Sequence, residues 1–209
     1  MGIDIQGFIE VRPWASWPDL PSEIPWEAAA RLDCLNITRD YDAFGCLFGV
    51  MNFAGFVPVA ADRGLPHDVS EAVRKEHQAE YQPARWTTWA SLQEIQSIDW
   101  DEPAENVDAR LHEYHRGADG QWRLAGKAAW SRAAFEAQGL DVPPPGTTPR
   151  VWPEGSTWTA GQVQYRAERL TRRQAIPPGG AWQPVWDVMA VLARLHGESN
   201  CRLVVWFEG

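Results

Sequence analysis

The run that decides the fold is Cys201-Arg202-Leu203-Val204-Val205-Trp206-Phe207, the densest group of strand-forming residues in the sequence. β-Branched and aromatic residues favour strands, and a short unbroken apolar run is typical of a strand buried on both faces. The segment before it has apolar residues at helical spacing from Trp182 to His196 and ends at Gly197. We therefore predict a central strand over 201–207 with the helix 182–196 packed beside it.

The first eleven residues predict a partner for that strand, because they alternate in polarity. One face carries Ile3, Ile5, Gly7, Ile9 and Val11, and the other carries Asp4, Gln6, Phe8 and Glu10. We predict an α+β fold: a mainly antiparallel sheet with the N- and C-terminal strands adjacent and the helices packed mostly on one face. The polar face of the first strand would then lie beside whichever of Arg202, Val204, Trp206 and Glu208 points the same way.

Between these ends the pattern predicts further elements. Helices are expected at 25–32, at 40–51 behind the cap Asp40, at 68–80, after capping boxes that begin at Ser91 and Thr171, and at 127–138. Strands are expected at 56–59, 85–89 and 161–170, with a hairpin at 111–116 and 121–124. Gly45 and Gly49 lie one turn apart, which indicates close packing of another element, with a nearby ligand as the alternative.

The length of 209 residues suits a single domain over 1–209. The segment from about 99 to 180 is less apolar and richer in proline and loops than the rest. We interpret it as an insertion or peripheral subregion between the N-terminal core and the closing helix and strand.

The charge of the chain argues against one class of partner, and it leaves open a local basic stripe or mimicry of DNA by the acidic surface. A net charge of −9 opposes the phosphate backbone, so we expect no non-specific nucleic-acid binding. The basic residues concentrate in one place, at Arg166, Arg169, Arg172 and Arg173. This concentration balances an acidic surface, with an anion or nucleotide phosphate site as the alternative.

The sequence also predicts the compartment and the absence of common prosthetic groups. It shows no signal peptide and no apolar run near the ~20 residues that span a bilayer, so we expect a cytoplasmic protein without a membrane partner. The three cysteines fit no zinc pattern, and His112 and His115 would point to opposite faces of a strand. No phosphate loop, dinucleotide fingerprint or Gly-x-Ser-x-Gly elbow occurs. We expect no metal and no cofactor.

Acid–base chemistry has three candidate carboxylates, Asp4, Asp42 and Glu10. Asp4 and Glu10 would lie about 20 Å apart along a strand, so they cannot act as a pair, and Asp4 with Asp42 is the pairing to test first. Candidate ligand-binding residues are Gln6, Arg39, Tyr41, Asn52, Arg63 and Trp86. The site is expected where the polar face of the first strand meets the helix at 40–51.

Thirteen tryptophans are unusual for this length. They predict a thick aromatic core, with an exposed stacking surface as the alternative. An exposed surface would be built from the loop residues Trp14, Trp17, Trp152 and Trp158.

Several of these segments occur together in a recognisable set. They are Met1-Gly2-x-Asp4-Ile5, Arg39-x-Tyr41-Asp42-x-Phe44, Gly49-Val50-x-Asn52, Arg63-Gly64-Leu65-Pro66-x-Asp68-Val69-Ser70, the Trp86–Trp89 piece and Arg202-Leu203-Val204-Val205-Trp206-Phe207. In these segments the chain resembles a family of uncharacterised proteins of tailed phages and actinobacteria, over about the first hundred and the last thirty residues. Relatives often carry histidine at the position of Gln6 and a His-Ser-His stretch near 82–85. The resemblance therefore implies that any metal site of the family is mostly lost here.

Three functions stay open at this point. The first is a small-molecule or nucleotide-binding protein. The second is a protein-binding inhibitor or accessory factor, such as a phage-type modulator of host defence. The third is an enzyme with an unrecognised acid–base site.

Overall fold

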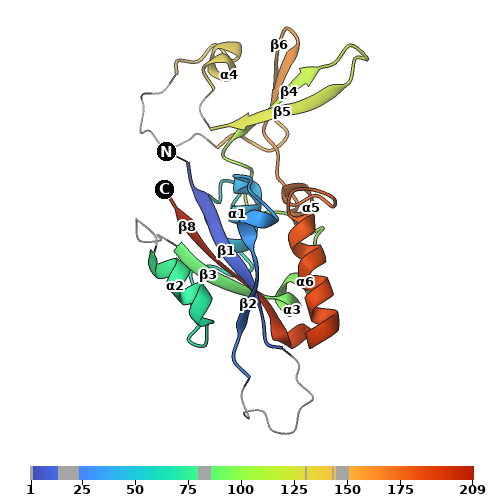
Figure 1. Ribbon diagram of the computed structural model, residues 1–209. Helices are drawn as coiled ribbons and strands as arrows, with labels where there is room; N and C mark the ends of the chain where they lie inside the picture. The colour runs from blue at the N-terminus through green and yellow to red at the C-terminus, as the bar shows by residue number, and fades with distance from the viewer. Residues whose placement is uncertain (1, 14–23, 80–85, 130, 143, 145–150) are drawn as a thin grey trace.

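The structure is a computed structural model, and it describes residues 2–13, 24–79, 86–129, 131–142, 144 and 151–209. The chain forms an α+β fold with two antiparallel four-stranded sheets (Figure 1). Both ends of the chain lie in the first sheet, so that sheet organises the molecule.

The first sheet has the strand order β2-β1-β8-β3. Its strands are β1 (Asp4–Val11), β2 (Glu27–Arg31), β3 (Trp86–Ser91) and β8 (Cys201–Glu208). The N-terminal strand β1 pairs with the C-terminal strand β8 without interruption, from Asp4 opposite Glu208 to Val11 opposite Cys201. This confirms the predicted pairing of the two ends. Gly7 is required here, because a Cβ at that position would lie 2.2 Å from the carbonyl oxygen of Val204.

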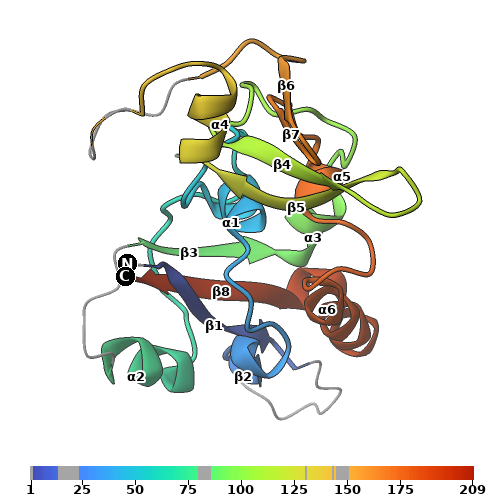
Figure 2. The same ribbon diagram turned by 90° about the horizontal axis from the view of Figure 1, so that it is seen from above.

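Both faces of β8 are buried. Leu203, Val205 and Phe207 belong to the main core, with no more than 1% of each side chain exposed. That core packs against α1 (Tyr41–Phe48), α3 (Leu92–Gln96), α5 (Arg172–Ala175) and α6 (Gln183–His196). Val204 and Trp206 face the other way, toward α2 (Glu71–Ala79). Figure 2 shows α2 on the opposite side of the sheet from α1, so the helices lie mostly on one face, as predicted.

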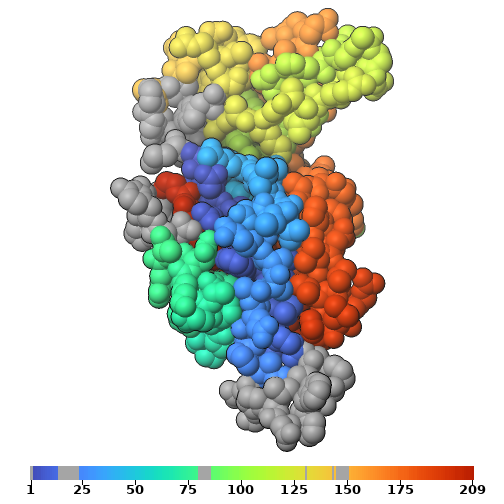
Figure 3. All heavy atoms as spheres, in the orientation of Figure 1, coloured from blue at the N-terminus to red at the C-terminus, as the bar shows by residue number. Residues whose placement is uncertain are grey.

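The second sheet has the order β5-β4-β7-β6. Its strands are β4 (Leu111–Arg116), β5 (Trp122–Ala128), β6 (Thr157–Ala160) and β7 (Val163–Arg166). Together with α4 (Arg132–Ala137) it encloses a smaller core that includes Phe135, Trp152 and Tyr165. Figure 3 shows this sheet and α4 as a lobe that stands out from the body of the molecule. All of these elements fall within the segment 99–180.

The second sheet is tied to the body through the backbone. The amide of Glu105 donates to the carbonyl of Gly55 (3.1 Å), and the amide of Ala109 donates to the carbonyl of Phe53 (3.0 Å). Two short 3₁₀ turns, Leu32–Cys34 and Glu198–Asn200, complete the described elements.

One predicted helix is wrong, and another is shorter than predicted. The stretch 25–32 forms the edge strand β2, because pairing with β1 outweighs the helix preference of its alanines. The helix behind Asp40 ends at Phe48, where Gly49 adopts φ +75° and caps it. Gly45 packs tightly, since a Cβ there would lie 2.8 Å from the Cα of Asn52. Close packing therefore explains Gly45, and the left-handed cap conformation explains Gly49.

Most of the other predicted elements that differ from the structure lie in the segment 99–180. The expected helix at 127–138 is only α4, because β5 continues to Ala128 before the cap at Ser131. Strand β6 was not predicted, and no strand forms at 56–59. The hairpin of β4 and β5 is confirmed, as are the capping boxes at Ser91 and Thr171.

The described tryptophans lie mainly in clusters. Trp182 and Trp206 are almost fully buried, and Trp152 packs edge-on against Trp158 at 4.8 Å in the smaller core. Trp14 and Trp17 lie outside the described residues. Among the described residues, no helix has the length and apolarity to cross a bilayer, and no group of His, Cys, Asp and Glu is arranged to hold a metal ion.

Candidate ligand-binding cleft

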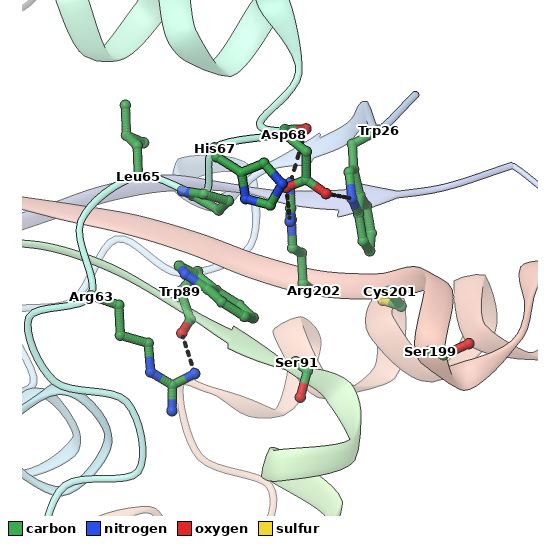
Figure 4. Close-up of a pocket in the computed structure, with 11 residues that line it drawn as sticks. Trp26, Arg63, Leu65, His67, Asp68, Trp89, Ser91, Ser199, Cys201 and Arg202 are labelled. Atoms are coloured by element: carbon green, nitrogen blue, oxygen red, sulfur yellow. Dashed lines mark hydrogen bonds and ion pairs between the residues drawn. The ribbon is translucent and has the colours of Figure 1, made fainter. Parts of the chain in front are cut away.

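A cleft of about 390 Å³ opens on the α2 side of the first sheet, where β8 begins (Figure 4). It is built from the loop before α2, the ends of β3 and β8, and the residue that precedes β2. Its lining residues are Trp26, Arg63, Leu65, Pro66, His67, Asp68, Trp89, Ser91, Ser199, Cys201 and Arg202.

Arg202 forms the inner wall of the cleft, and only 5% of its side chain is exposed. It lies opposite Glu10 in the β1–β8 register, and its Nε donates to Glu10 Oε2 at 2.8 Å. Glu10 is fully buried and also accepts from the backbone amide of Ser70 at 2.8 Å. A buried guanidinium and a buried carboxylate each need such a partner, because an unpaired charge in the interior is strongly destabilising.

Asp68 holds the other side of Arg202. Its carboxylate accepts from Arg202 Nη1 (2.8 Å), from the indole nitrogen of Trp26 (2.8 Å) and from Arg12 Nη2 (3.2 Å). Burial raises the pKa of Asp68, but the hydrogen bond and charge of Arg202, together with the Trp26 hydrogen bond, outweigh that effect. The pKa of Asp68 is therefore held below its usual value, and the carboxylate stays charged.

Guanidinium groups and indole rings alternate across this end of the sheet. The guanidinium carbon of Arg202 lies 3.9 Å from the ring centre of Trp26 and 5.9 Å from that of Trp89. Arg12 lies 4.8 Å from the Trp26 ring, and Arg63 lies 5.1 Å from the Trp89 ring. Each such contact contributes about 0.5–2 kcal/mol depending on exposure. Each indole ring therefore contacts two guanidinium groups, and these contacts hold both rings in place.

Arg63 is fixed by a bidentate pair with Glu94, at 2.7 and 3.0 Å. It also donates to the carbonyls of Trp89 and Val59, both at 3.1 Å. Glu94 is at the same time the third helical residue of the capping box that Ser91 begins. The rim of the cleft is therefore anchored to the start of α3.

Three of the residues that line the cleft have unused hydrogen-bonding groups within the described part of the chain. Arg202 uses three of its five N–H groups on Glu10 and on the side chain and carbonyl of Asp68, which leaves one N–H on each terminal nitrogen. The imidazole of His67 is exposed and the hydroxyl of Ser199 lines the cleft, and neither has a hydrogen bond within the described part of the chain.

The thiol of Cys201 is not among these groups. It points into the main core, where it donates to the carbonyl of Met189 at 3.7 Å. Burial raises the pKa of Cys201 to about 12. A thiolate nucleophile is therefore not available at neutral pH.

Two of the nine predicted site residues contribute to the cleft: Glu10 through Arg202, and Arg63 directly. Asp4 and Gln6 lie at the other end of β1, opposite Glu208 and Trp206, and α1 packs on the opposite face of the sheet from the cleft. Trp86 also points to that opposite face, since its neighbour three residues on, Trp89, faces the cleft and strand side chains alternate.

The remaining candidates have local partners. Asp4 forms a two-point pair with Arg39 at 2.5 and 2.7 Å, and both side chains are more than half exposed. The Tyr41 hydroxyl accepts from the backbone amide of Ile3 at 3.1 Å. Gln6 donates to Glu208 at 3.5 Å. Asn52 closes a loop by bonding both backbone groups of Phe56, at 2.8 and 2.9 Å.

Asp42 belongs to a second buried network, which lies between α1 and the second sheet. It pairs with Arg110 and Lys127. Arg110 also binds Asp108 through two nitrogens, at 2.9 and 2.6 Å. Asp4 and Asp42 thus have different partners, and the structure does not bring the two carboxylates together.

The same network contains the buried histidine of the predicted pair. His112 lies between Asp108 (3.2 Å from Nε2) and Glu168 (3.0 Å from Nδ1), and Tyr114 donates to Glu168 at 2.8 Å. His115 is exposed, on the other face of β4.

The four clustered arginines all lie near carboxylates. Arg169, Arg172 and Arg173 pair with Glu154, Glu102 and Asp101 at 2.8–3.0 Å, and Arg166 lies 3.7 Å from Glu168. This arrangement favours charge balance over an anion site.

Of the eleven lining residues only Arg63 was predicted, and the ten that were missed include Trp26, His67, Asp68, Trp89 and Arg202. A usable signal existed for Arg202, because a lone charge in an apolar strand must face either solvent or a buried partner. No family model, curated protein or solved structure matches the chain. The function is therefore argued from the cleft itself.

Proposed function

We propose that the protein binds a small molecule in the cleft between Trp26, Trp89 and Arg202. The observation that carries the proposal is Arg202. Its side chain is almost buried and fixed on two carboxylates, yet two of its N–H groups remain available where it lines an open cleft. The size of the cleft, about 390 Å³, lies within the range of small-molecule sites, which is roughly 300–1,000 Å³.

The placement of the side chains also favours binding. Ligand sites are typically apolar with a few fixed polar groups. Here the indoles, Leu65 and Pro66 provide the apolar surface, and Arg202 is held by the sheet rather than by a mobile loop. Three segments that carry the family resemblance, 63–70, 86–89 and 202–207, all contribute to this one place.

The two other functions have less support. The protein-binding hypothesis requires exposed loop tryptophans, but Trp152 and Trp158 pack in the smaller core, and Trp14 and Trp17 lie outside the described residues. For the enzyme hypothesis, the pairing to test first was Asp4 with Asp42, and these two carboxylates have different partners.

The proposal is tested by a fragment screen with ligand-observed NMR on three proteins: the wild type, Trp89→Leu and Trp122→Leu. Trp122 is a matched control because it is also half-buried in a strand beside an arginine, Arg116, at 5.9 Å, but it lies in the second sheet. We expect a set of fragments that bind the wild type and Trp122→Leu and are lost in Trp89→Leu. If no fragment depends on Trp89, the cleft is not the binding site.

A second measurement uses the protein as its own host makes it. Native mass spectrometry of protein purified from that host is expected to show a bound small molecule that Trp89→Leu releases. Free protein in both preparations, together with an empty fragment screen, overturns the proposal.

A further inference from the structure

The charges around the cleft are already balanced. Each guanidinium has a carboxylate partner at 2.7–3.2 Å: Arg202 with Glu10, Arg12 with Asp68, and Arg63 with Glu94. Asp68 also binds Arg202 at 2.8 Å. Three positive groups therefore meet three negative ones, and among the described lining residues the exposed imidazole of His67 and the thiol of Cys201 are the further titratable groups.

This balance decides against an anionic ligand. A carboxylate or phosphate that approached the terminal nitrogens of Arg202 would be attracted by that guanidinium but repelled by Asp68 and Glu10. It would also lose its own hydration without neutralising an unpaired charge. A neutral carbonyl oxygen accepts the same hydrogen bonds, and it brings no net charge into the cleft.

The rest of the wall selects the shape of the ligand. The indoles of Trp26 and Trp89 lie on either side of Arg202, and Figure 4 shows both rings at the wall of the cleft. Flat rings pack against indole surfaces better than puckered saturated rings do. Leu65 and Pro66 close the apolar side.

We infer that the ligand of this cleft is a neutral planar ring that carries a carbonyl acceptor, such as an aryl carboxamide or a lactam-type heterocycle. The carbonyl accepts from Arg202, and the ring packs against Trp89. This assignment rests on the proposed function, since it names the ligand class of the same cleft.

Three probes of similar size separate the contributions of charge and shape. Benzamide is planar and neutral, benzoate is planar and anionic, and cyclohexanecarboxamide is neutral and puckered. Each is titrated into ¹⁵N-labelled protein, and the indole N–H signals of Trp26 and Trp89 report occupancy. We expect benzamide to shift both signals, and the other two probes to bind at least about tenfold more weakly.

The variant Arg202→Lys tests the hydrogen bond directly. Lysine keeps a positive charge beside Glu10 but loses the planar donor pair. We expect Arg202→Lys to lose about tenfold in benzamide affinity while its weak benzoate binding changes little. An unchanged thermal transition shows that the variant is folded, and in the event of a shifted transition the same comparison is made with Trp89→Leu.

The outcomes separate this inference from the proposed function. Benzoate binding as tightly as benzamide, or tighter, makes the cleft an anion site, and equal binding of cyclohexanecarboxamide removes the role of the flat ring. Either result overturns the ligand class. If all three probes fail while other fragments bind in a Trp89-dependent way, the ligand class is wrong and the cleft is still a binding site. If no compound binds there, both proposals are wrong.

Discussion

Two buried arginines, Arg110 and Arg202, are each held between two carboxylates, but one lies at a contact between the two sheets and the other borders a cleft. Arg110 joins Asp108 to Asp42, and so links the second sheet to the start of α1. Arg202 joins Glu10 to Asp68 on the first sheet. Both side chains are at most 11% exposed. The chemistry is the same, and what differs is the neighbour of the guanidinium: Arg110 packs against Phe53, whereas Arg202 lines the cleft.

The network around Arg110 has further protein contacts. Its guanidinium carbon lies 4.8 Å from the ring centre of Phe53, and Asp108 is further bound by His112. Burial raises the pKa of Asp108, but the hydrogen bonds from His112 and Arg110 and the charge of Arg110 outweigh that effect and hold the pKa well below its usual value. We conclude that this network stabilises the contact between the two sheets, whereas the network of Arg202, in our proposal, presents donors to a ligand.

The largest effect is expected from Arg110→Met. Methionine matches the length of the side chain but leaves Asp42 and the fully buried Asp108 without their main cation. Breaking a buried pair in this way costs about 3–5 kcal/mol in the free energy of unfolding, measured by urea denaturation. The control is Arg123→Met, which removes an exposed pair with Asp119 and is expected to leave the urea midpoint unchanged. A midpoint for Arg110→Met equal to that of the control would contradict a stabilising role.

The next largest loss of stability is expected from Asp108→Asn, and this loss should depend on pH. Because the pKa of Asp108 is lower in the folded state than the unfolded value of about 3.9, its charge stabilises the fold above that value. That contribution decreases as the pH falls below about 4 toward the folded pKa. At pH 7 we expect the variant to be about 3 kcal/mol less stable than the wild type. The difference should narrow between pH 4 and the acid limit of the measurement, and a constant difference would show that the charge of Asp108 is not the cause.

The first sheet could be predicted from the sequence because its signals are local. Alternation in residues 3–11 and the apolar run 201–207 each define a buried strand, and two such strands at the chain ends have few ways to pair. Stretch 25–32 was misread because its alanines favour a helix and its partner, β1, is not visible in its own sequence. Propensity is a weak signal wherever a distant strand supplies the hydrogen bonds.

The cleft could be predicted only in part, for a geometric reason. Glu10 was predicted to lie on the polar face of the first strand, beside whichever of Arg202, Val204, Trp206 and Glu208 points the same way, but its pairing with Arg202 was not predicted. Trp26 and Asp68 enter from loops whose path depends on the whole fold. Whether Trp86 or Trp89 faces the cleft depends on the register of β3 with its neighbouring strand. A shift of one residue in that register would exchange the two faces of the strand.

The smallest loss of stability is expected from Glu10→Gln. The same variant also tests which ligand the cleft prefers. Glutamine keeps the shape and one acceptor for Arg202 but removes a buried negative charge, so we expect a loss of about 2 kcal/mol in the free energy of unfolding. This is less than for Arg110→Met, because Asp68 still holds Arg202. The cleft then carries an excess positive charge, and its preference should move from benzamide toward benzoate. Because the lining residues are unchanged, a benzamide-to-benzoate affinity ratio equal to that of the wild type would show that charge balance does not set the ligand class. A ratio that falls while the fold persists would show that Glu10, which lies behind Arg202 and lines no part of the cleft, determines what the cleft accepts.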